Sequence, residues 1–276
     1  LCVGGVALAL TAPISESAED EDTSMPTNVD DQSEEIAADE DGLLEYVAAA
    51  LQEAPEPRAG DNFQPGTKGD DILEGGADNE FIDGKSGDDE LLGGPGSDVL
   101  VGGSGNDIMV SDEGEDSLYG GSGDDALHGR TGDDLMKGGS GEDSLFGGEG
   151  DDLLIGGDES EDYLIGAAGD DVLITGPSDH AYGGDGKDMF ILFSSTSADE
   201  AAELADFDNN NDRIMVLVCP DQADAVVTVN PSENDPDQAE LRIDGEVYAT
   251  FATAEAPSPE DVQVVVSSAD ALAALR

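Results

Sequence analysis

Basic residues are scarce in this sequence of 276 residues. Lysine and arginine together number 9, against 67 aspartates and glutamates, which gives a formal net charge of −58 at pH 7. A surface of this sign repels the phosphate backbone of nucleic acids, because binding to that backbone depends on Lys and Arg. We therefore expect no nucleic-acid partner.

Aromatic residues and cysteines are also few. The chain has no Trp, 5 Tyr and 7 Phe, so the sequence shows no aromatic platform on which sugar rings would stack. Its two cysteines, Cys2 and Cys219, lie far apart in the sequence. One disulfide between them is an alternative, but two unpaired thiols are favoured. The two histidines, His128 and His180, are interpreted as surface or edge residues rather than catalysts.

Motifs that carry enzyme chemistry are missing as well. The sequence contains no H-E-x-x-H zinc motif, no G-x-S-x-G nucleophile elbow, no G-x-G-x-x-G and no Walker loop. Adjacent acids such as Asp124-Asp125 and Asp151-Asp152 could suggest the acid and base of a glycosidase, but a repeat explains them better. We predict that the chain is not an enzyme and holds neither catalytic residues nor an organic cofactor.

The sequence is rich, by contrast, in a nine-residue repeat. The period runs without slippage from Gly66 to Ile155, and four looser units extend it to Ile191. Residues 156–165 form a unit with one extra residue, and residues 175–182 form a unit that is one residue short. In the ten strict units the eighth position is always apolar and the sixth is always acidic. The sixth-position residues are Asp71, Glu80, Asp89, Asp98, Asp107, Asp116, Asp125, Asp134, Asp143 and Asp152. A fixed period of this kind indicates stacked structural units.

The residue types at each position predict the shape of a unit. Glycines at the first, second and fourth positions supply backbone conformations with positive φ, so the first six residues can turn sharply. The last three residues, such as Val99-Leu100-Val101, alternate across a short strand, and only the middle side chain points inward. Two units make one coil of eighteen residues. We therefore predict an all-β solenoid over residues 65–192.

Stacking the coils builds two ladders of sixth-position carboxylates, with rungs about 4.8 Å apart. Neighbouring charges repel by about 1 kcal/mol in water and by about 3–4 kcal/mol at an effective dielectric constant near 20. A hard cation between the turns reverses the sign. Calcium accepts six to eight oxygens at flexible angles, whereas magnesium keeps its waters and a stricter octahedron, so the repeat favours calcium. One ladder holds Asp71, Asp89, Asp107, Asp125, Asp143 and Asp162; the other holds Glu80, Asp98, Asp116, Asp134, Asp152, Asp171 and, if the short unit keeps register, Asp188.

The pattern G-G-x-G-x-D-x-U-x, in which U is a large apolar residue, resembles the RTX nonapeptide repeat. The resemblance covers residues 66–191 in fourteen units. It implies a right-handed parallel β-roll in which each calcium ion takes sixth-position carboxylates and glycine-region carbonyls from two turns. The carboxylate ligands so implied are Asp71, Asp89, Asp98, Asp107, Asp116, Asp125, Asp134, Asp143, Asp152, Asp162, Asp171 and Asp188, and the carbonyls are those near Gly94, Gly96, Gly103, Gly105, Gly121, Gly123, Gly139, Gly141, Gly148 and Gly150.

The repeat count limits the number of calcium ions. Two stacks of seven units leave six gaps each, so about twelve ions at most fit between turns. Twelve ions, each with two positive charges, bring the net charge of −58 only to −34. A saline habitat, or a need to stay soluble and unfolded during export, is left to explain the remainder. The metal-free chain is expected to be largely unfolded, with calcium binding as the folding reaction. Units 75–83 and 175–182 are expected to bind worst.

Two predicted segments precede the repeat. Residues 1–14 are an apolar segment too short to span a bilayer, and represent either a truncated anchor or signal, or an apolar end without function. A membrane is a partner only in the first case. Residues 15–64 have the composition of an acidic disordered linker. Within it, apolar residues at helical spacing predict a short helix near 43–52 that covers the open first coil.

Residues 193–276 are predicted to form a β-rich cap with a C-terminal secretion signal. Ser197 followed by Glu200 is a capping box and predicts a helix over Ala198–Ala205. Asp206–Asp212 resembles an EF-hand loop but lacks its glycine and glutamate, so a turn is favoured over an ion site. Asp244-Gly245 is a two-residue hairpin turn. Strands are expected at Arg213–Cys219, Ala225–Val229, Glu240–Ile243, Glu246–Phe251 and Val262–Val266.

Together these features predict a secreted calcium-binding repeat protein. The resemblance, which extends more weakly to the C-terminal region, implies type I export from a Gram-negative bacterium. The expected role is a structural or adhesive component of a surface or matrix, and a cell surface or an extracellular polysaccharide is an open partner. The alternative is an accessory and secretion module of an extracellular enzyme (protease, lipase or polysaccharide epimerase) whose catalytic domain is absent here. The strict period disfavours a third possibility, an acidic disordered chain without a specific site.

Overall fold

A computed structural model of the chain describes residues 54–57, 62–158, 160–193, 201–218, 226–232, 235–253, 256–259 and 262–266. Several predictions lie wholly or mostly outside these residues: the apolar segment 1–14, the disordered linker, the short helix near 43–52, both cysteines and the apolar end of the C-terminal signal. The predicted linker 15–64 extends too far, because residues 62–64 belong to strand β1 (Asn62–Pro65). The described residues contain strands and turns but no helix, and so no helix that could cross a membrane.

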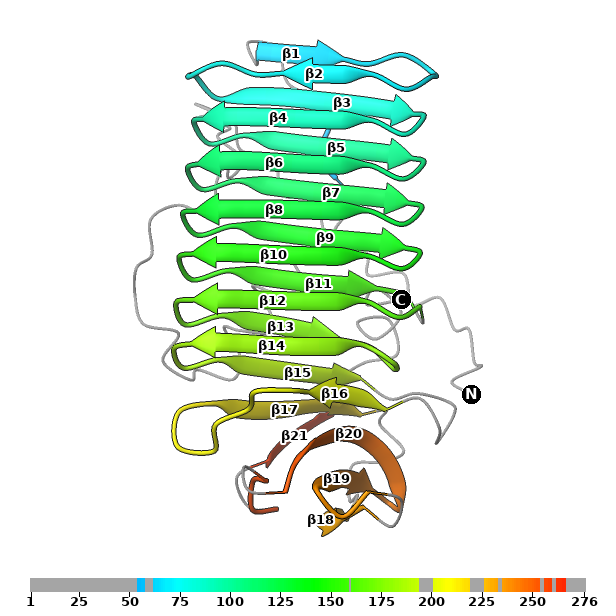
Figure 1. Cartoon of the computed structure of the whole chain (residues 1–276), viewed down its shortest axis with the longest axis vertical. Coiled ribbons are helices and arrows are strands. Elements are labelled where there is room, and N and C mark those ends of the chain that lie inside the picture. Colours follow the sequence, from blue (N-terminus) through cyan, green and yellow to red (C-terminus); the bar gives the residue numbers. More distant parts are fainter. Residues whose placement is uncertain are drawn as a thin grey trace, which may run out of the picture.

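The described strands stack into a long two-sheet solenoid, with β1 at one end and the C-terminal strands at the other (Figure 1). From β1 to β17 successive strands alternate between the two sheets, so each coil contributes one strand to each. Sheet A contains, in order, β1 (Asn62–Pro65), β3 (Glu80–Ser86), β5 (Val99–Ser104), β7 (Ser117–Ser122), β9 (Leu135–Ser140), β11 (Leu153–Gly157), β13 (Val172–Thr175), β15 (Met189–Phe193), β17 (Arg213–Val218) and β21 (Val262–Val266). Sheet B contains β2 (Ile72–Glu74), β4 (Glu90–Pro95), β6 (Ile108–Glu113), β8 (Ala126–Thr131), β10 (Ser144–Glu149), β12 (Tyr163–Ala168), β14 (His180–Asp185), β16 (Ala202–Leu204), β20 (Glu246–Ala252), β19 (Gln238–Ile243) and β18 (Val227–Pro231). The predicted all-β parallel solenoid is confirmed.

The register of the strands follows the repeat. Leu100 on β5 pairs with Leu118 on β7, a step of eighteen residues. The extra residue in 156–165 lengthens the step, so that Leu145 pairs with Leu164, and the short unit 175–182 reduces the next step, so that Leu164 pairs with Ala181. The two irregularities cancel, and the stack keeps its alignment through both.

The strands are longer than the sequence predicts. Three-residue strands were expected at positions seven to nine, but β5 spans six residues and continues through Gly102 and Gly103 into the next unit. The cause is the stacking itself, because Gly103 pairs with Gly121 of the next coil and so extends the ladder. The predicted sharp turn shrinks to the three residues that separate successive strands.

Eighth-position side chains form the core, as predicted. Twelve of the thirteen from Ile82 to Phe190 are fully shielded from solvent, and Leu145 is 1% exposed. Leu73 in the first described coil is only partly buried and packs against this core. One cluster runs from Ile82 through the repeat to Phe251 and Val262. The C-terminal strands therefore share the core of the repeat.

The C-terminal region extends both sheets. In sheet A, β17 pairs with β15 and β21 in parallel; in sheet B, β16 pairs in parallel with β14 and β20. Strands β18, β19 and β20 are antiparallel. The predicted turn at Asp244-Gly245 joins β19 to β20, and both residues have positive φ (52° and 91°), as a type I′ turn requires. The five predicted strands are present, with the second shifted to Val227–Pro231.

The predicted helix over Ala198–Ala205 is wrong where the structure describes it. Residues 198–200, with the capping-box glutamate, lie outside the described residues, but Ala202–Leu204 is strand β16. Ala202 and Leu204 are buried and Glu203 between them is not, which is the alternation of a strand. Glu203 N–H donates to the Asp179 carbonyl and continues the coil. Stacking on the solenoid has overridden a local helix signal.

Candidate metal centre

The sixth-position carboxylates form two ladders inside the turns, as the sequence predicts. In each ladder the backbone N–H of one rung donates to Oδ1 of the rung in the next coil. Asp98 N–H donates to Asp116 Oδ1 (2.7 Å), and on the opposite side Asp107 N–H donates to Asp125 Oδ1 (2.8 Å). The first ladder runs from Glu80 to Asp188 and the second from Asp71 to Asp162. Each carboxylate is thus held in a fixed orientation by the adjacent coil.

The second oxygen of nearly every rung is buried and has no hydrogen-bond partner among the described residues. This unsatisfied Oδ2 recurs in both ladders, at Asp89, Asp98, Asp107, Asp116, Asp125, Asp134, Asp143, Asp152, Asp162, Asp171 and Asp188. Burying a carboxylate oxygen without a partner costs several kcal/mol, so native structures rarely do so. The same unsatisfied Oδ2 occurs at eleven rungs, which indicates that these oxygens face sites for a positively charged ligand.

First-position residues define the space beside each Oδ2. A Cβ added to Gly93 would lie 2.5 Å from Asp98 Oδ2 and 2.9 Å from the Ser111 carbonyl oxygen in the next coil. A Cβ added to Gly102 would meet Asp107 Oδ2 and the Gly120 carbonyl oxygen in the same way. The carboxylate oxygen and the carbonyl oxygen therefore face one small space, which a side chain would fill.

The first-position glycines correct one prediction. Positive φ was expected at the first, second and fourth positions, but the structure shows it at the second and fourth, as at Gly103 (112°) and Gly105 (125°), and not at Gly102. Glycine is favoured at the first position because the next coil approaches closely there, although Ser111 occupies it in one unit. The sequence pattern marks this position, but it does not distinguish close approach from an unusual φ.

The second- and fourth-position carbonyls lie where successive coils touch. A Cβ on Gly121 would clash with the Gly103 carbonyl oxygen, and a Cβ on Gly123 would clash with that of Gly105. The structure therefore places these carbonyls between neighbouring turns, where they were expected, although the first-position carbonyls lie beside Oδ2. The ligand role of the ten carbonyls named from the sequence, near Gly94 to Gly150, stays a prediction. The first-position carbonyls are the groups that the sequence reasoning missed.

Burial raises the pKa of the ladder carboxyls from Asp89 to Asp188, and nearby acidic groups, in most cases neighbouring rungs, raise it further. Backbone N–H donors oppose the shift without cancelling it. The pKa is raised to about 7 for Asp98, Asp125, Asp162 and Asp171, to about 8 for Asp134 and Asp143, to about 9 for Asp152 and to about 6 for Asp188. At neutral pH the carboxyls of Asp134, Asp143 and Asp152 therefore favour the protonated form unless a cation neutralises them.

The two ladders are longer than predicted. Asp162 N–H donates to Asp179 Oδ1 (3.1 Å), so Asp179 follows Asp162 in its ladder. Asp188 N–H donates to Asp212 Oδ1 (3.1 Å), so Asp212 follows Asp188. Neither residue occupies a regular sixth position, and so the repeat pattern missed both. Asp212 closes a turn in which Asp208 accepts from Asn210, which agrees with the turn expected at Asp206–Asp212.

The fifth-position acids are exposed, but they also join coils. They were expected to be solvated charges only. Asp124 Oδ1 accepts from Glu142 N–H (3.1 Å) and Asp88 Oδ1 accepts from Asn106 N–H (3.0 Å). These bonds run in the opposite direction to those of the sixth position, from the later coil to the earlier one. Because both fifth-position carboxylates face solvent, they lack the desolvation that characterises the ladders.

The ladder geometry fits a hard cation. In the described residues no three side chains of His, Cys, Asp or Glu converge on one point, so an inter-turn ion would need backbone oxygens as well as carboxylates. The structure supplies both kinds of oxygen at most first-position glycines, such as Gly93, Gly102 and Gly120. Calcium accepts such mixed oxygen sets at flexible angles. The sixth-position aspartates would hold the ion, and the ion would supply the positive charge that the unpartnered Oδ2 atoms lack.

A family model agrees with this interpretation of the repeat. This model, described as the RTX calcium-binding nonapeptide repeat, matches five overlapping or adjoining stretches between residues 66 and 178. The extracellular lipase LipA from Serratia marcescens matches 76% of this chain at 16% identity, with a TM-score of 0.24. The chain spans 41% of that lipase. The AlgE6R3 subunit of the Azotobacter vinelandii mannuronan C5-epimerase matches 75% of this chain, with 85% of its own length covered, 17% identity and a TM-score of 0.21. No curated protein matches the sequence.

Proposed function

We propose that this chain, whose residues 66–178 are an array of RTX calcium-binding nonapeptide repeats, is a secreted structural protein whose solenoid folds when calcium binds between its coils. The observation that carries the proposal is the row of eleven buried, unpartnered Oδ2 atoms in the two ladders. Without a cation these carboxylates favour the unfolded, hydrated chain. With one, each becomes a link between two coils.

The residues of the chain prepare each site before an ion arrives. A backbone N–H fixes Oδ1 of each aspartate and so turns Oδ2 toward the neighbouring first-position carbonyl. Glycine at the first position leaves the space between them open. Both coils must be stacked for the site to exist, so the free energy of calcium binding is also free energy of folding. At low calcium the acidic chain stays extended, which suits passage through an export channel.

A calcium titration of the purified full chain tests this mechanism. In EGTA, far-UV circular dichroism should show a largely unordered chain, and millimolar calcium should produce a cooperative gain in β signal. Magnesium at the same concentration is the matched control and should produce much less order. A chain that stays compact and β-rich in EGTA would rule out folding coupled to the metal.

We propose a structural or adhesive role for the folded solenoid, without a catalytic step. Its length and its dense acidic charge suit a rigid surface or matrix component, with a cell surface or an extracellular polysaccharide as the partner. Secretion in bacteria that lack a type I exporter should fail, whereas cells with one should release the chain. The alternative, an accessory module of an extracellular enzyme, requires a catalytic domain encoded next to these residues in the parent gene. Finding one would replace the structural role but leave the calcium mechanism intact.

A further inference from the structure

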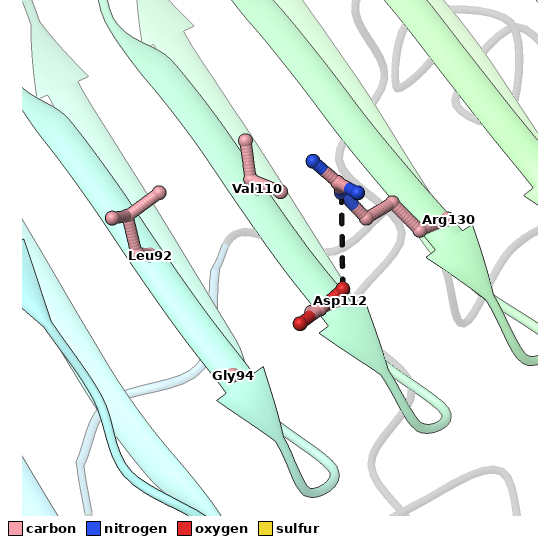
Figure 2. Close-up of a pocket in the computed structure, with 5 residues that line it drawn as sticks. All are labelled: Leu92, Gly94, Val110, Asp112 and Arg130. Carbon is pink, nitrogen blue, oxygen red and sulfur yellow. Dashed lines mark ion pairs between the residues drawn. The ribbon is translucent and has the colours of Figure 1, made fainter.

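The outer faces of the two sheets differ, although the same repeat positions form them. On sheet B, apolar seventh- and ninth-position side chains face solvent: Ile108 is 51% exposed, Tyr163 42% and Phe146 40%. This face also has an open hollow of about 210 Å³, which Leu92, Val110, Asp112 and Arg130 line (Figure 2). Seventh and ninth positions are therefore not buried by the solenoid alone.

On sheet A, the corresponding side chains of the later coils are buried. They form a second hydrophobic cluster, separate from the core, which we call the outer cluster. Its members are at most 9% exposed: Leu153, Ile155, Val172, Ile174, Met189, Ile191, Phe193, Met215 and Leu217, with the partly buried Leu135 at its edge. All of them lie on β9, β11, β13, β15 and β17. Among the described residues, no hydrophobic side chain outside these strands belongs to the cluster.

Ala54 shows which part of the chain reaches this face. It begins the first described stretch, residues 54–57, and it lines a hollow of about 200 Å³ together with Val101, Tyr119 and Lys137 on the outer face of sheet A. Burial also raises the pKa of the Tyr119 hydroxyl, as a covered face requires. Ala54 thus lies over β5, β7 and β9, and Leu135 at the edge of the outer cluster is also on β9.

The residues just before Ala54 have the composition and length to cover the cluster. Leu43, Leu44, Val47 and Leu51 fall at helical spacing, on one face of a helix. Eleven residues of helix are about 16 Å long. The four strand spacings from β9 to β17 amount to about 19 Å. The apolar face and the outer cluster are therefore of similar extent.

We propose that residues 43–53 pack across the outer face of sheet A and cover the outer cluster. This placement replaces the sequence-based expectation that the segment covers the first coil, since Ala54 lies over β5 to β9 rather than over β1 and β2. The docking face exists only when the coils are stacked. Calcium would then control where the N-terminal segment sits, as well as the fold of the repeat.

Three single variants of the full chain, each saturated with calcium, test the proposal. Leu51→Asp places a charge on the proposed covering face. Leu272→Asp does the same in the apolar C-terminal stretch, the other candidate cover, and Ile108→Asp is the matched control on the exposed face of sheet B. We expect Leu51→Asp alone to lower the Tm by roughly 5 °C or more and to increase binding of the dye ANS several-fold. The Ile108→Asp variant should behave as wild type.

A reciprocal measurement uses the docking face itself. Residues 43–53 should be protected from hydrogen exchange in calcium, and Ile174→Asp on β13 should abolish that protection while the ladders keep their calcium. Loss of Tm in Leu272→Asp but not in Leu51→Asp would overturn the proposal in favour of the C-terminal stretch. No effect in either variant, together with a calcium-dependent dimer in sedimentation, would overturn it in favour of a second copy of the chain.

Discussion

The carboxylates in the middle of each ladder differ from those at its ends in the hydrogen-bond partners of their two oxygens. In the middle, as at Asp134, one oxygen accepts a backbone N–H and the other is buried without a partner. At the ends the chain supplies the second donor itself: Gly176 N–H reaches Asp179 Oδ2 (2.6 Å), and Thr67 N–H reaches Asp71 Oδ2 (2.6 Å). At these ends hydrogen bonds satisfy the oxygens that are unpartnered in the middle of the ladders. The demand for calcium is concentrated in the interior coils.

The largest expected effect comes from breaking the middle of one ladder. Asp107→Asn together with Asp125→Asn removes two adjacent charged rungs, so at least two inter-coil sites should lose calcium. An ion present at a hundred times its Kd contributes about 2.7 kcal/mol. In a chain of this size 1 kcal/mol corresponds to about 2–4 °C. We expect the Tm in saturating calcium to fall by roughly 10 °C, with a lower stoichiometry in isothermal titration calorimetry. An unchanged stoichiometry would contradict the assignment of these aspartates as ligands.

Protonation of the buried carboxyls should stabilise the metal-free fold, as calcium does. The effect should be larger in the middle of the ladders than at their ends. Burial raises the folded-state pKa of Asp134 to about 8 and that of Asp152 to about 9, from an ordinary value of 3.8. At pH values between the ordinary pKa and the raised folded-state pKa, the folded metal-free chain binds more protons than the unfolded chain does. The stability of the folded chain is therefore greatest below pH 4 and is lost as pH rises toward 9. In EGTA the β signal in circular dichroism should therefore decrease from pH 4 to pH 9. A β signal that increases with pH would contradict the burial of these carboxyls in the folded chain.

The calcium affinity should show the opposite dependence. Protons compete with calcium for the same oxygens, so affinity should rise with pH over the range in which the ladder carboxyls titrate. Titration calorimetry in buffers of different ionisation enthalpy would count the protons released. Release of protons at pH 7 is expected, since the pKa of Asp98 and that of Asp125 are raised to about 7.

The repeat region could be predicted from the sequence because its signal is periodic and local. Nine-residue spacing gives the coil, the eighth position gives the core at residues such as Leu118, and the sixth position gives both ladders. The strand register across the irregular units can also be predicted, because the one extra residue and the one missing residue cancel. Each of these features depends on residues that are neighbours in the repeat.

Features that depend on contacts between distant residues could not be predicted. Asp179 and Asp212 join the ladders although neither has the repeat spacing. Residues 202–204 become a strand because β14 offers a free edge, despite the helix signal at Ser197. The outer cluster was also missed: its strands are continuous apolar runs, such as Met189–Phe193, which indicate burial on both faces, but the sequence does not show what covers the outer face.

A smaller effect is expected at the first rung of a ladder. Glu80 accepts hydrogen bonds from Asn62 Nδ2 (2.6 Å) and from Gly76 N–H (2.9 Å), so both of its oxygens have partners. Glu80→Gln keeps one acceptor and loses about one hydrogen bond, worth roughly 1 kcal/mol. We expect a Tm lower by about 2–4 °C and a calcium stoichiometry reduced by one at most. A loss as large as that of the Asp107/Asp125 double variant would mean that the end and the middle do not differ.

The smallest effect should come from a fifth-position acid, which shares the charge of the ladders without their burial. Asp124 is adjacent to Asp125, and its exposed carboxylate accepts Glu142 N–H, a bond that an asparagine carbonyl can keep. Asp124→Asn should change the Tm by less than about 2 °C, because exposed substitutions mostly cost within 0.5 kcal/mol. Its calcium stoichiometry should equal that of the wild type. If Asp124→Asn instead lost as much calcium as a ladder variant, the ions would be held by the diffuse acidic surface of the chain, and position in the coil would not matter. Equal stoichiometry, set against the loss in the ladder variant, would show that burial and not total charge selects the binding oxygens.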